Sequence, residues 1–149
     1  IRRDIVITQG DLREIQLAKA AIYTGVSILM RNMGISPSDI RKIFVAGAFG
    51  NYIDTQNAMI IGMYPDVPLE RVEFVGNTAG SGARMTLLST EMRRLADEIA
   101  RRIQYIELGA DRSFNSEFIK ATYFPHKEAH RFPNVTRWLS KRRPNEKRT

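Results

Sequence analysis

Hydrophobic positions recur at steps of three and four residues near the start of the chain, which predicts a long amphipathic helix. Thr8 followed by Asp11 has the form of a capping box, and Gly34 is a typical helix terminator. We therefore expect a helix over about residues 11–32. Its predicted apolar stripe consists of Ile15, Ala18, Ile22, Gly25 or Val26, Leu29 and Met33. Small residues at Ala18, Ala20, Ala21 and Gly25 favour close packing against a neighbour.

Two short apolar runs, at about residues 42–48 and 71–75, predict buried strands that each end in glycines. Between them, Asp54 or Thr55 suits the start of a short helix that Gly62 stops. A strand–helix–strand unit of this length predicts parallel strands, whose carboxyl ends share one edge of the sheet. That edge is where open α/β sheets bind ligands.

The remaining pattern predicts three further elements. A second long helix is expected from about Ala83 to Arg102, a third strand at residues 104–108, and a last amphipathic helix at residues 114–123. The expected fold class is α/β, with short parallel strands and crossover helices. We expect an α/β body over residues 1–125 and a separate carboxyl-terminal tail over residues 126–149.

The two glycine turns after the predicted strands are the candidate binding elements. A glycine turn after a strand can be a simple turn, or it can leave the backbone open to a ligand phosphate, sugar or base, and the residues alone leave both interpretations open. The helix after Gly76 would point its free N–H groups into the same crevice, which suits an anion. Asn51 and Asn77 could adopt positive φ or hydrogen-bond a nucleotide. The spacing fits neither a P-loop nor Gly-x-Gly-x-x-Gly.

The net charge of +7 is concentrated in the last part of the chain. Residues 126–149 contain Lys127, Arg131, Arg137, Lys141, Arg142, Arg143, Lys147 and Arg148 against Glu128 and Glu146. The body is therefore nearly neutral, and we expect the tail to be solvated and partly disordered. Nucleic-acid binding is not favoured, because only Trp138 interleaves with these charges and no recognition motif is present.

The sequence lacks the residues that several kinds of site require. The 149 residues include no cysteine, so the chain itself can hold no disulfide and no cysteine-ligated zinc or iron–sulfur cluster. Two histidines, His126 and His130, make a poor metal site. Asp39, Asp54 and Asp66 fit capping or solvation better than general-base catalysis. No apolar run is long enough to span a membrane and the opening residues lack a secretory pattern, so we expect a cytoplasmic protein, and the start at Ile1 suggests a fragment.

Six motifs in order resemble the carboxyl-terminal domain of the reductive activators of corrinoid enzymes. These activators belong to the superfamily of acetate and sugar kinases, heat-shock chaperones and actin. The motifs are Gln16 to Ile22, Val45 to Asp54, Ile61-Gly62 with Pro65, Val75 to Ala83, Tyr105 to Leu108, and Phe124-Pro125-His126. The resemblance covers about residues 5–135 and implies a partial lobe of an actin-like ATPase fold. It implies an ATPase that returns a corrinoid protein from cob(II) to cob(I), with the electron supplied by an iron–sulfur domain outside this chain.

The resemblance also implies roles for particular residues. The matched adenosine motif comprises Gly47, Ala48, Phe49, Gly50 and Asn51. The glycine-rich segment beside the nucleotide comprises Gly76, Asn77, Thr78, Gly80 and Gly82, and Gln16 and Lys19 match a helix that borders the adenine. The phosphate loops, the Mg-dependent chemistry and the catalytic acid are expected before Ile1. Losing two phosphate contacts of roughly 1.5 to 3 kcal/mol each predicts that the isolated chain barely binds ATP and does not hydrolyse it.

Two other classes of function stay open at this point. One is a different enzyme of the same superfamily, either a small-molecule kinase or an activator of a radical dehydratase. The other is a module without catalysis that docks a corrinoid protein or forms a homodimer, with the basic tail holding an acidic patch.

Overall fold

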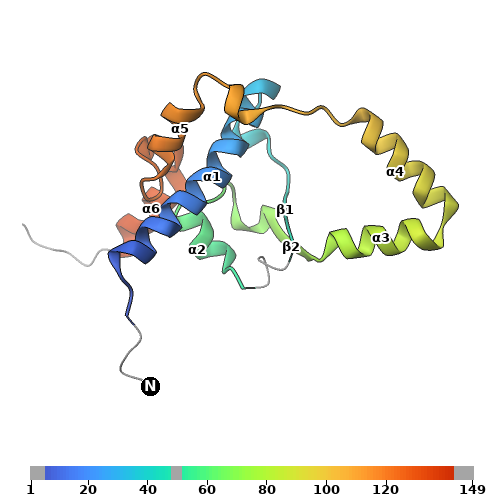
Figure 1. Cartoon of the computed structure of the whole chain (residues 1–149). Helices are drawn as coiled ribbons and strands as arrows, with labels where there is room; N and C mark the ends of the chain where they lie inside the picture. Colours follow the sequence, from blue (N-terminus) through green and yellow to red (C-terminus); the bar gives the residue numbers. More distant parts are fainter. Residues whose placement is uncertain (1–5, 48–51, 143–149) are drawn as a thin grey trace, which may run out of the picture.

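The longest helix, α1 (Gln9–Met33), crosses the body of the molecule in the computed structural model, which describes residues 6–47 and 52–142 (Figure 1). Both halves of the capping box form, because Asp11 N donates to Thr8 Oγ1 at 3.2 Å and Thr8 N donates to Asp11 Oδ2 at 2.8 Å. Gly34 closes the helix in the left-handed conformation, with φ of 65°. The predicted position and both ends of this helix are confirmed.

The buried face of α1 is not the predicted apolar stripe. Ile15, Ile22, Leu29 and Met33 are at least 42% exposed, whereas the buried residues are Lys19, Ala20, Tyr23, Thr24, Gly25, Ile28 and Met30. Of the small residues expected to allow close packing, Ala20 and Gly25 are buried while Ala18 and Ala21 are exposed. The stripe prediction was wrong for this chain because α1 packs on α5 (Phe114–Ala121) through an adjacent face, and that face contains polar groups with specific partners.

Strands β1 (Ile43–Ala46) and β2 (Val72–Gly76) pair in parallel, as predicted, with Ile43 opposite Val72 and Ala46 opposite Gly76. Helix α2 (Thr55–Ile60) lies between them in sequence, and its predicted cap Asp54 accepts from Asn57 N at 2.7 Å. The third predicted strand was wrong. Residues 104–107 form no strand, Leu108–Ala110 is a 3-10 turn, and Tyr105 is 85% exposed. In the described residues, this segment pairs with neither β1 nor β2.

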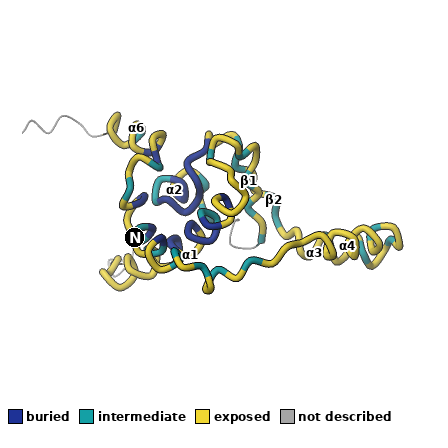
Figure 2. The backbone as a smooth tube through the Cα atoms, turned by 90° about the horizontal axis from the view of Figure 1, so that it is seen from above, coloured by how far each residue is buried: buried dark blue, intermediate teal, exposed yellow. Residues whose placement is uncertain are grey.

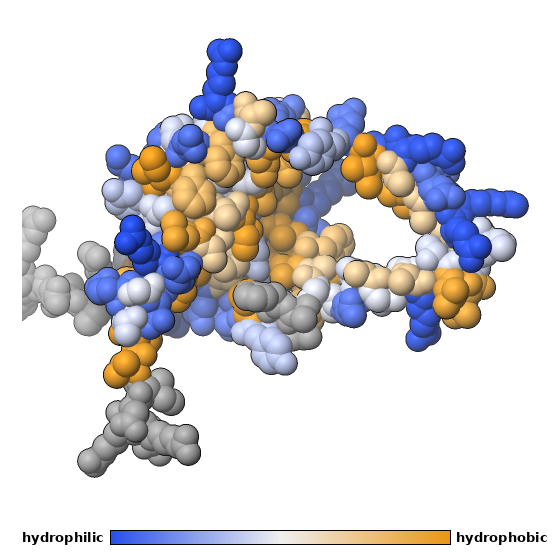
Figure 3. All heavy atoms as spheres, in the orientation of Figure 1, coloured by the Kyte–Doolittle hydropathy of each residue, from blue (hydrophilic) through white to orange (hydrophobic). Residues whose placement is uncertain are grey.

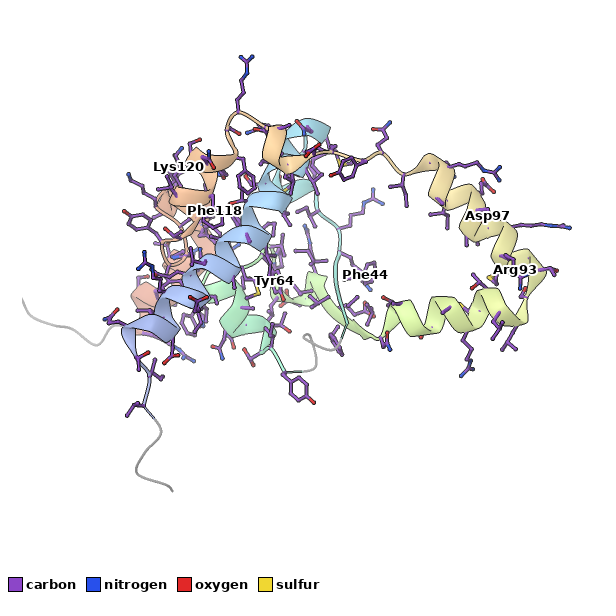
Figure 4. The ribbon with its side chains drawn as sticks, viewed as in Figure 1. Phe44, Tyr64, Arg93, Asp97, Phe118 and Lys120 are labelled. Carbon is purple, nitrogen blue, oxygen red and sulfur yellow. The ribbon has the colours of Figure 1, made fainter. Side chains whose placement is uncertain are left out.

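The predicted second long helix is divided in two. Helix α3 (Thr78–Leu88) and helix α4 (Thr90–Arg102) meet at Ser89, whose side chain caps α4 by accepting from Met92 N at 3.2 Å. At this corner the guanidinium of Arg93 donates to the carbonyl oxygen of Thr86 at 3.1 Å (Figure 4). The two helices form an arm that projects from the body (Figures 1 and 2). Neither helix contains a buried residue.

The core lies between α1, α2, α5 and the last helix, α6 (Pro133–Arg142) (Figure 2). Its buried members are Ala20, Tyr23, Met59, Val67, Ala121, Phe132 and Val135. Phe132 is fully buried and Val135 is 4% exposed. The prediction of a solvated tail after residue 125 was therefore wrong for the stretch that reaches α6, because that stretch completes the core. Residues 143–149 lie outside the described residues.

Asp66 holds α6 to the body. Its Oδ2 accepts from Asn134 N, in the first turn of α6, at 2.7 Å. The carboxylate thus caps a helix that lies far away in sequence, at the end where the helix dipole favours negative charge. Burial raises the pKa of Asp66, and hydrogen bonds from Asn134 act in the opposite direction. Of the roles considered from the sequence, capping is the one Asp66 has, although the helix that it caps could not be foreseen.

Candidate functional site

The two glycine turns lie side by side at the carboxyl ends of β1 and β2. Gly47 has φ of 92° and Gly76 has φ of 69°, a region that only glycine enters without strain. Gly47 N donates to Gly76 O at 2.8 Å, so a backbone hydrogen bond joins the turns. Among residues 6–47 and 52–142, no heavy atom lies within 4 Å of where a β-carbon would stand at either glycine. The described part of the chain therefore leaves the backbone at this edge accessible to a ligand.

Helix α3 begins directly after the second turn, and Asn77 is its cap. The side-chain oxygen of Asn77 accepts from Gly80 N at 2.9 Å. Of the two roles that the sequence allowed for Asn77, positive φ is not adopted, because its φ is −81° and Gly76 supplies the left-handed turn instead. The capping oxygen is occupied, so the side-chain NH₂ group remains as a donor toward a ligand. The dipole of α3 adds partial positive charge at the same place.

A hollow of about 370 Å³ opens along the first two turns of α3. It is lined by Asn77, Gly80, Ser81, Arg84 and Met85. These positions follow the spacing i, i+3, i+4, i+7 and i+8, so they share one helix face. Asn77 and Gly80 are predicted from the sequence, whereas Ser81, Arg84 and Met85 are not. The helical spacing after Asn77 was the signal that could have identified them.

Two other residues of the glycine-rich segment lie on α3 outside this hollow. Thr78 is exposed at the first helical position, and Gly82 is half-buried, with no heavy atom within 4 Å of where a β-carbon would stand. Of the predicted adenosine motif, the structure places Gly47 only. Ala48, Phe49, Gly50 and Asn51 lie outside the described residues, and their role stays a prediction.

Lys19 does not present its ammonium group to a ligand. The residue is fully buried, and Nζ donates to the carbonyl oxygens of Tyr123 and Pro125, each at 2.7 Å. Burial lowers the pKa of Lys19 to about 8, while the two acceptors favour the charged form. The structure corrects its assignment as a nucleotide-binding residue, because both contacts hold the 123–125 segment against α1. Gln16, one turn earlier on α1, is half-buried.

A charged network continues from this segment into the body. Glu117, which is 7% exposed, forms an ion pair with Arg131 and accepts from Ser27 Oγ at 2.8 Å. His126 Nδ1 accepts from Glu128 N at 3.0 Å, so a neutral His126 holds its proton on Nε2, which lies 3.9 Å from Glu117 Oε1. Burial lowers the pKa of His126 and favours this neutral form. The network joins α1, α5 and the 126–131 segment, and within the described residues the Nε2 of His126 is its one buried polar side-chain atom without a hydrogen-bond partner.

Neither a metal site nor a membrane span is found in the part of the chain that the structure describes. In residues 6–47 and 52–142, no three His, Cys, Asp or Glu side chains gather as metal ligands would. Within the same ranges, no helix has the length and hydropathy needed to cross a membrane. The chemistry visible at the candidate site is therefore that of backbone N–H groups, one side-chain amide, one hydroxyl and the guanidinium of Arg84.

Comparison with known proteins identifies the family of this chain. Residues 1–136 match the family model described as the C-terminal domain of RACo, the ASKHA domain. The chain is 48% identical over 122 residues to the corrinoid activation enzyme RamQ of Eubacterium limosum, covering 82% of this chain and 21% of RamQ. It is 32% identical over 119 residues to the [Co(II) methylated amine-specific corrinoid protein] reductase of Methanosarcina barkeri, covering 77% of this chain and 22% of that protein.

A solved structure gives the same result. The reductive activator for corrinoid, iron–sulfur protein superposes with a TM-score of 0.81 at 37% sequence identity, over 87% of this chain and 21% of that one. The chain thus spans about a fifth of the length of the relatives that it matches. On the family match and this superposition, the chain belongs to the family of the C-terminal ASKHA domain of RACo.

Proposed function

We propose that this chain is the nucleotide-binding part of an ATP-dependent reductive activator that returns a corrinoid protein from cob(II) to cob(I). The relatives named above, a corrinoid activation enzyme and a corrinoid protein reductase, support the reaction and the partner. The family of the ASKHA domain supports ATP as the nucleotide. These matches favour a reductive activator over the small-molecule kinase and the radical-dehydratase activator.

The observation that carries the proposal is the pair of joined glycine turns. Because Gly47 and Gly76 lie together without β-carbons, an adenosine can approach the backbone at the end of the sheet. Ser81 and Arg84 then border it from α3, and the amide of Asn77 can donate to it. The planar guanidinium of Arg84 is suited to lie against a base.

The same residues limit what this part of the protein does. The hollow beside α3 is lined by no carboxylate that could hold Mg²⁺ or orient an attacking water. We therefore assign binding of adenosine to this chain, and we assign the Mg²⁺ ligands and the hydrolytic acid to the remainder of the longer protein. The chain has no cysteine, so the iron–sulfur cluster that supplies the electron also belongs to that remainder.

A matched pair of glycine substitutions in the full-length protein tests the nucleotide site. Gly34 and Gly76 have nearly equal φ, 65° and 69°. At both positions, the β-carbon of an alanine would stand more than 4 Å from the heavy atoms of other described residues. Alanine at either position therefore costs a similar left-handed strain of about 1 kcal/mol. Only Gly76→Ala adds a methyl group at the crevice. We expect Gly76→Ala to weaken ATP binding about tenfold by calorimetry, and Gly34→Ala to leave it unchanged.

Equal ATP affinities for the two variants would contradict the site. Arg84→Ala extends the test, with an expected loss of several-fold in ATP affinity. The rate at which each variant reduces cob(II) in the corrinoid protein should fall in the same order, because the proposed activity depends on the nucleotide.

A further inference from the structure

The exposed side of α6 carries three cations. Arg137, Lys141 and Arg142 are exposed, and none of them forms an ion pair within residues 6–47 and 52–142. With Trp138 they occupy positions i, i+1, i+4 and i+5, so they form one continuous helix face, which we call the basic face. The family match ends at residue 136, immediately before these residues. The basic face therefore lies outside the residues that the family model matches.

Trp138 separates two hollows beside this face. One, of about 250 Å³, has an apolar floor that includes Met59, Ile60 and Val67. The other, of about 570 Å³, is bordered by Pro125 and Leu139. Both are lined by Trp138, so the two hollows adjoin each other beside α6, and we call them together the groove. The guanidinium of Arg142 lies 4.0 Å from the centre of the Trp138 ring, which fixes both side chains.

Two carboxylates border the groove and offset part of the positive charge of the basic face. Asp66 caps α6 through Asn134 N, and the charge of Arg137 acts on the same carboxylate and lowers its pKa, against the effect of burial. Glu70 lies on the wall of the smaller hollow, in the 3-10 turn Leu69–Arg71, and forms no ion pair with the cations of α6. The groove therefore combines apolar hollows with an excess of positive charge along one rim.

We propose that the basic face and this groove dock an extended, acidic segment of a partner protein. Apolar side chains of the segment would enter the two hollows, and its carboxylates would meet Arg137, Lys141 and Arg142. If the proposed function holds, this partner is the corrinoid protein. The identity of the partner rests on the proposed function, whereas the proposal of a docking groove is independent of it. Nucleic acid fits less well. The only tryptophan, Trp138, has one face of its ring covered by Arg142, and that face is unavailable for stacking of a base.

The test uses the full-length protein and a fluorescein-labelled poly-L-glutamate peptide, followed by fluorescence anisotropy at several salt concentrations. The double variant Lys141→Glu/Arg142→Glu reverses two charges at an exposed helix end. The matched control, Arg94→Glu/Arg101→Glu, makes the same change in net charge on exposed positions of α4. We expect the α6 variant to weaken peptide binding at least tenfold and to reduce its salt dependence, and the control to bind like the parent protein.

Equal losses in both variants would show general electrostatic attraction and overturn the proposal, as would no loss in either. Tighter binding of a DNA duplex or of phosphatidylserine vesicles than of the peptide would also overturn it. Trp138→Ala should weaken peptide binding while Trp138→Phe retains most of it, and a melting curve for each verifies folding. ATP affinity should be the same in all these variants, so a failure of the nucleotide site and a failure of the docking groove give different results.

Discussion

The body of this molecule buries its apolar side chains in a core, whereas the arm leaves them exposed. In the body, α1, α2, α5 and α6 enclose a core in which Ala20, Ala121 and Phe132 are fully buried. In the arm, α3 and α4 contain no buried residue, although Leu95, Ile99 and Ile103 recur on one face of α4 and beyond its end. Figure 3 shows hydrophobic residues on both sides of the opening between arm and body.

The body encloses its own core, whereas the arm leaves its apolar side chains exposed. The exposed apolar stripe of α1 and the apolar face of α4 have the pattern of buried helix surfaces, yet within the described residues nothing covers them. Because the relatives are about four times as long as this chain, we expect the remainder of the longer protein to cover both faces. The body should then respond strongly to mutation and the arm weakly when this chain is studied alone.

The largest effect is expected for Phe132→Ala. Phe132 is fully buried between α1 and α6, so its loss should lower the free energy of unfolding by about 3–5 kcal/mol. Urea denaturation measures the change. Phe44→Ala, at a phenylalanine that is 60% exposed on β1 (Figure 4), is the control and should cost less than about 1 kcal/mol. If Phe132→Ala lowered the free energy of unfolding no more than Phe44→Ala, the assignment of Phe132 to the core would be contradicted.

Lys19→Met should have the next largest effect. It leaves two buried carbonyl oxygens without a donor, which we expect to cost about 2–3 kcal/mol of unfolding free energy. Lys42→Met is the control, because Lys42 pairs with Glu73 at the surface and should contribute less than about 1 kcal/mol. Similar losses for both lysines in chemical denaturation would show that the buried contacts of Lys19 do not hold the body together.

The same lysine should give the body a dependence on pH. The pKa of Lys19 is lowered from 10.5 to about 8 on folding, so between these values the unfolded chain binds more protons than the folded one. The contribution of Lys19 to the free energy of unfolding should therefore be lowest below about pH 8 and should rise as the pH increases from about 8 to 10.5. Subtracting the profile of Lys19→Met from that of the parent protein isolates this contribution. A difference that falls with pH over this window would contradict the assignment.

A smaller loss is expected for Asp66→Ala. This change removes the cap of α6 and should cost about 1–2 kcal/mol of unfolding free energy, detectable as a lower melting temperature. Asp97→Ala, at an exposed aspartate on α4 (Figure 4), should change stability by less than about 0.5 kcal/mol. If the two changes were equal, α6 would not depend on its contact with the 65–68 loop.

The smallest effect is expected in the arm. Ile99→Ala removes a side chain that is 49% exposed and should cost less than about 1 kcal/mol in this chain. Ile28→Ala makes the same chemical change at a fully buried position of α1 and should cost about 2–4 kcal/mol. In the full-length protein the cost of Ile99→Ala should increase. No increase there would show that the arm remains uncovered.

Much of the local structure could be predicted because its causes are local. The capping box at Thr8, the cap at Asp54 and the left-handed Gly34 each depend on residues within a few positions. The parallel pairing of β1 and β2 followed from the length of the connection between them. The break at Ser89 was missed although it too is local, because the serine cap lies inside an otherwise continuous apolar pattern.

The order of most elements, the two glycine turns and the family motifs can be read from the sequence. The three-dimensional arrangement was needed to show that Gly47 N and Gly76 O join the turns, that Lys19 binds carbonyls within the body, and that Phe132 belongs to the core. The physical reason is that burial and hydrogen-bond partners depend on residues far apart in sequence. A lysine on a helix has the same local pattern whether its ammonium meets a nucleotide or the backbone of a segment about one hundred residues away.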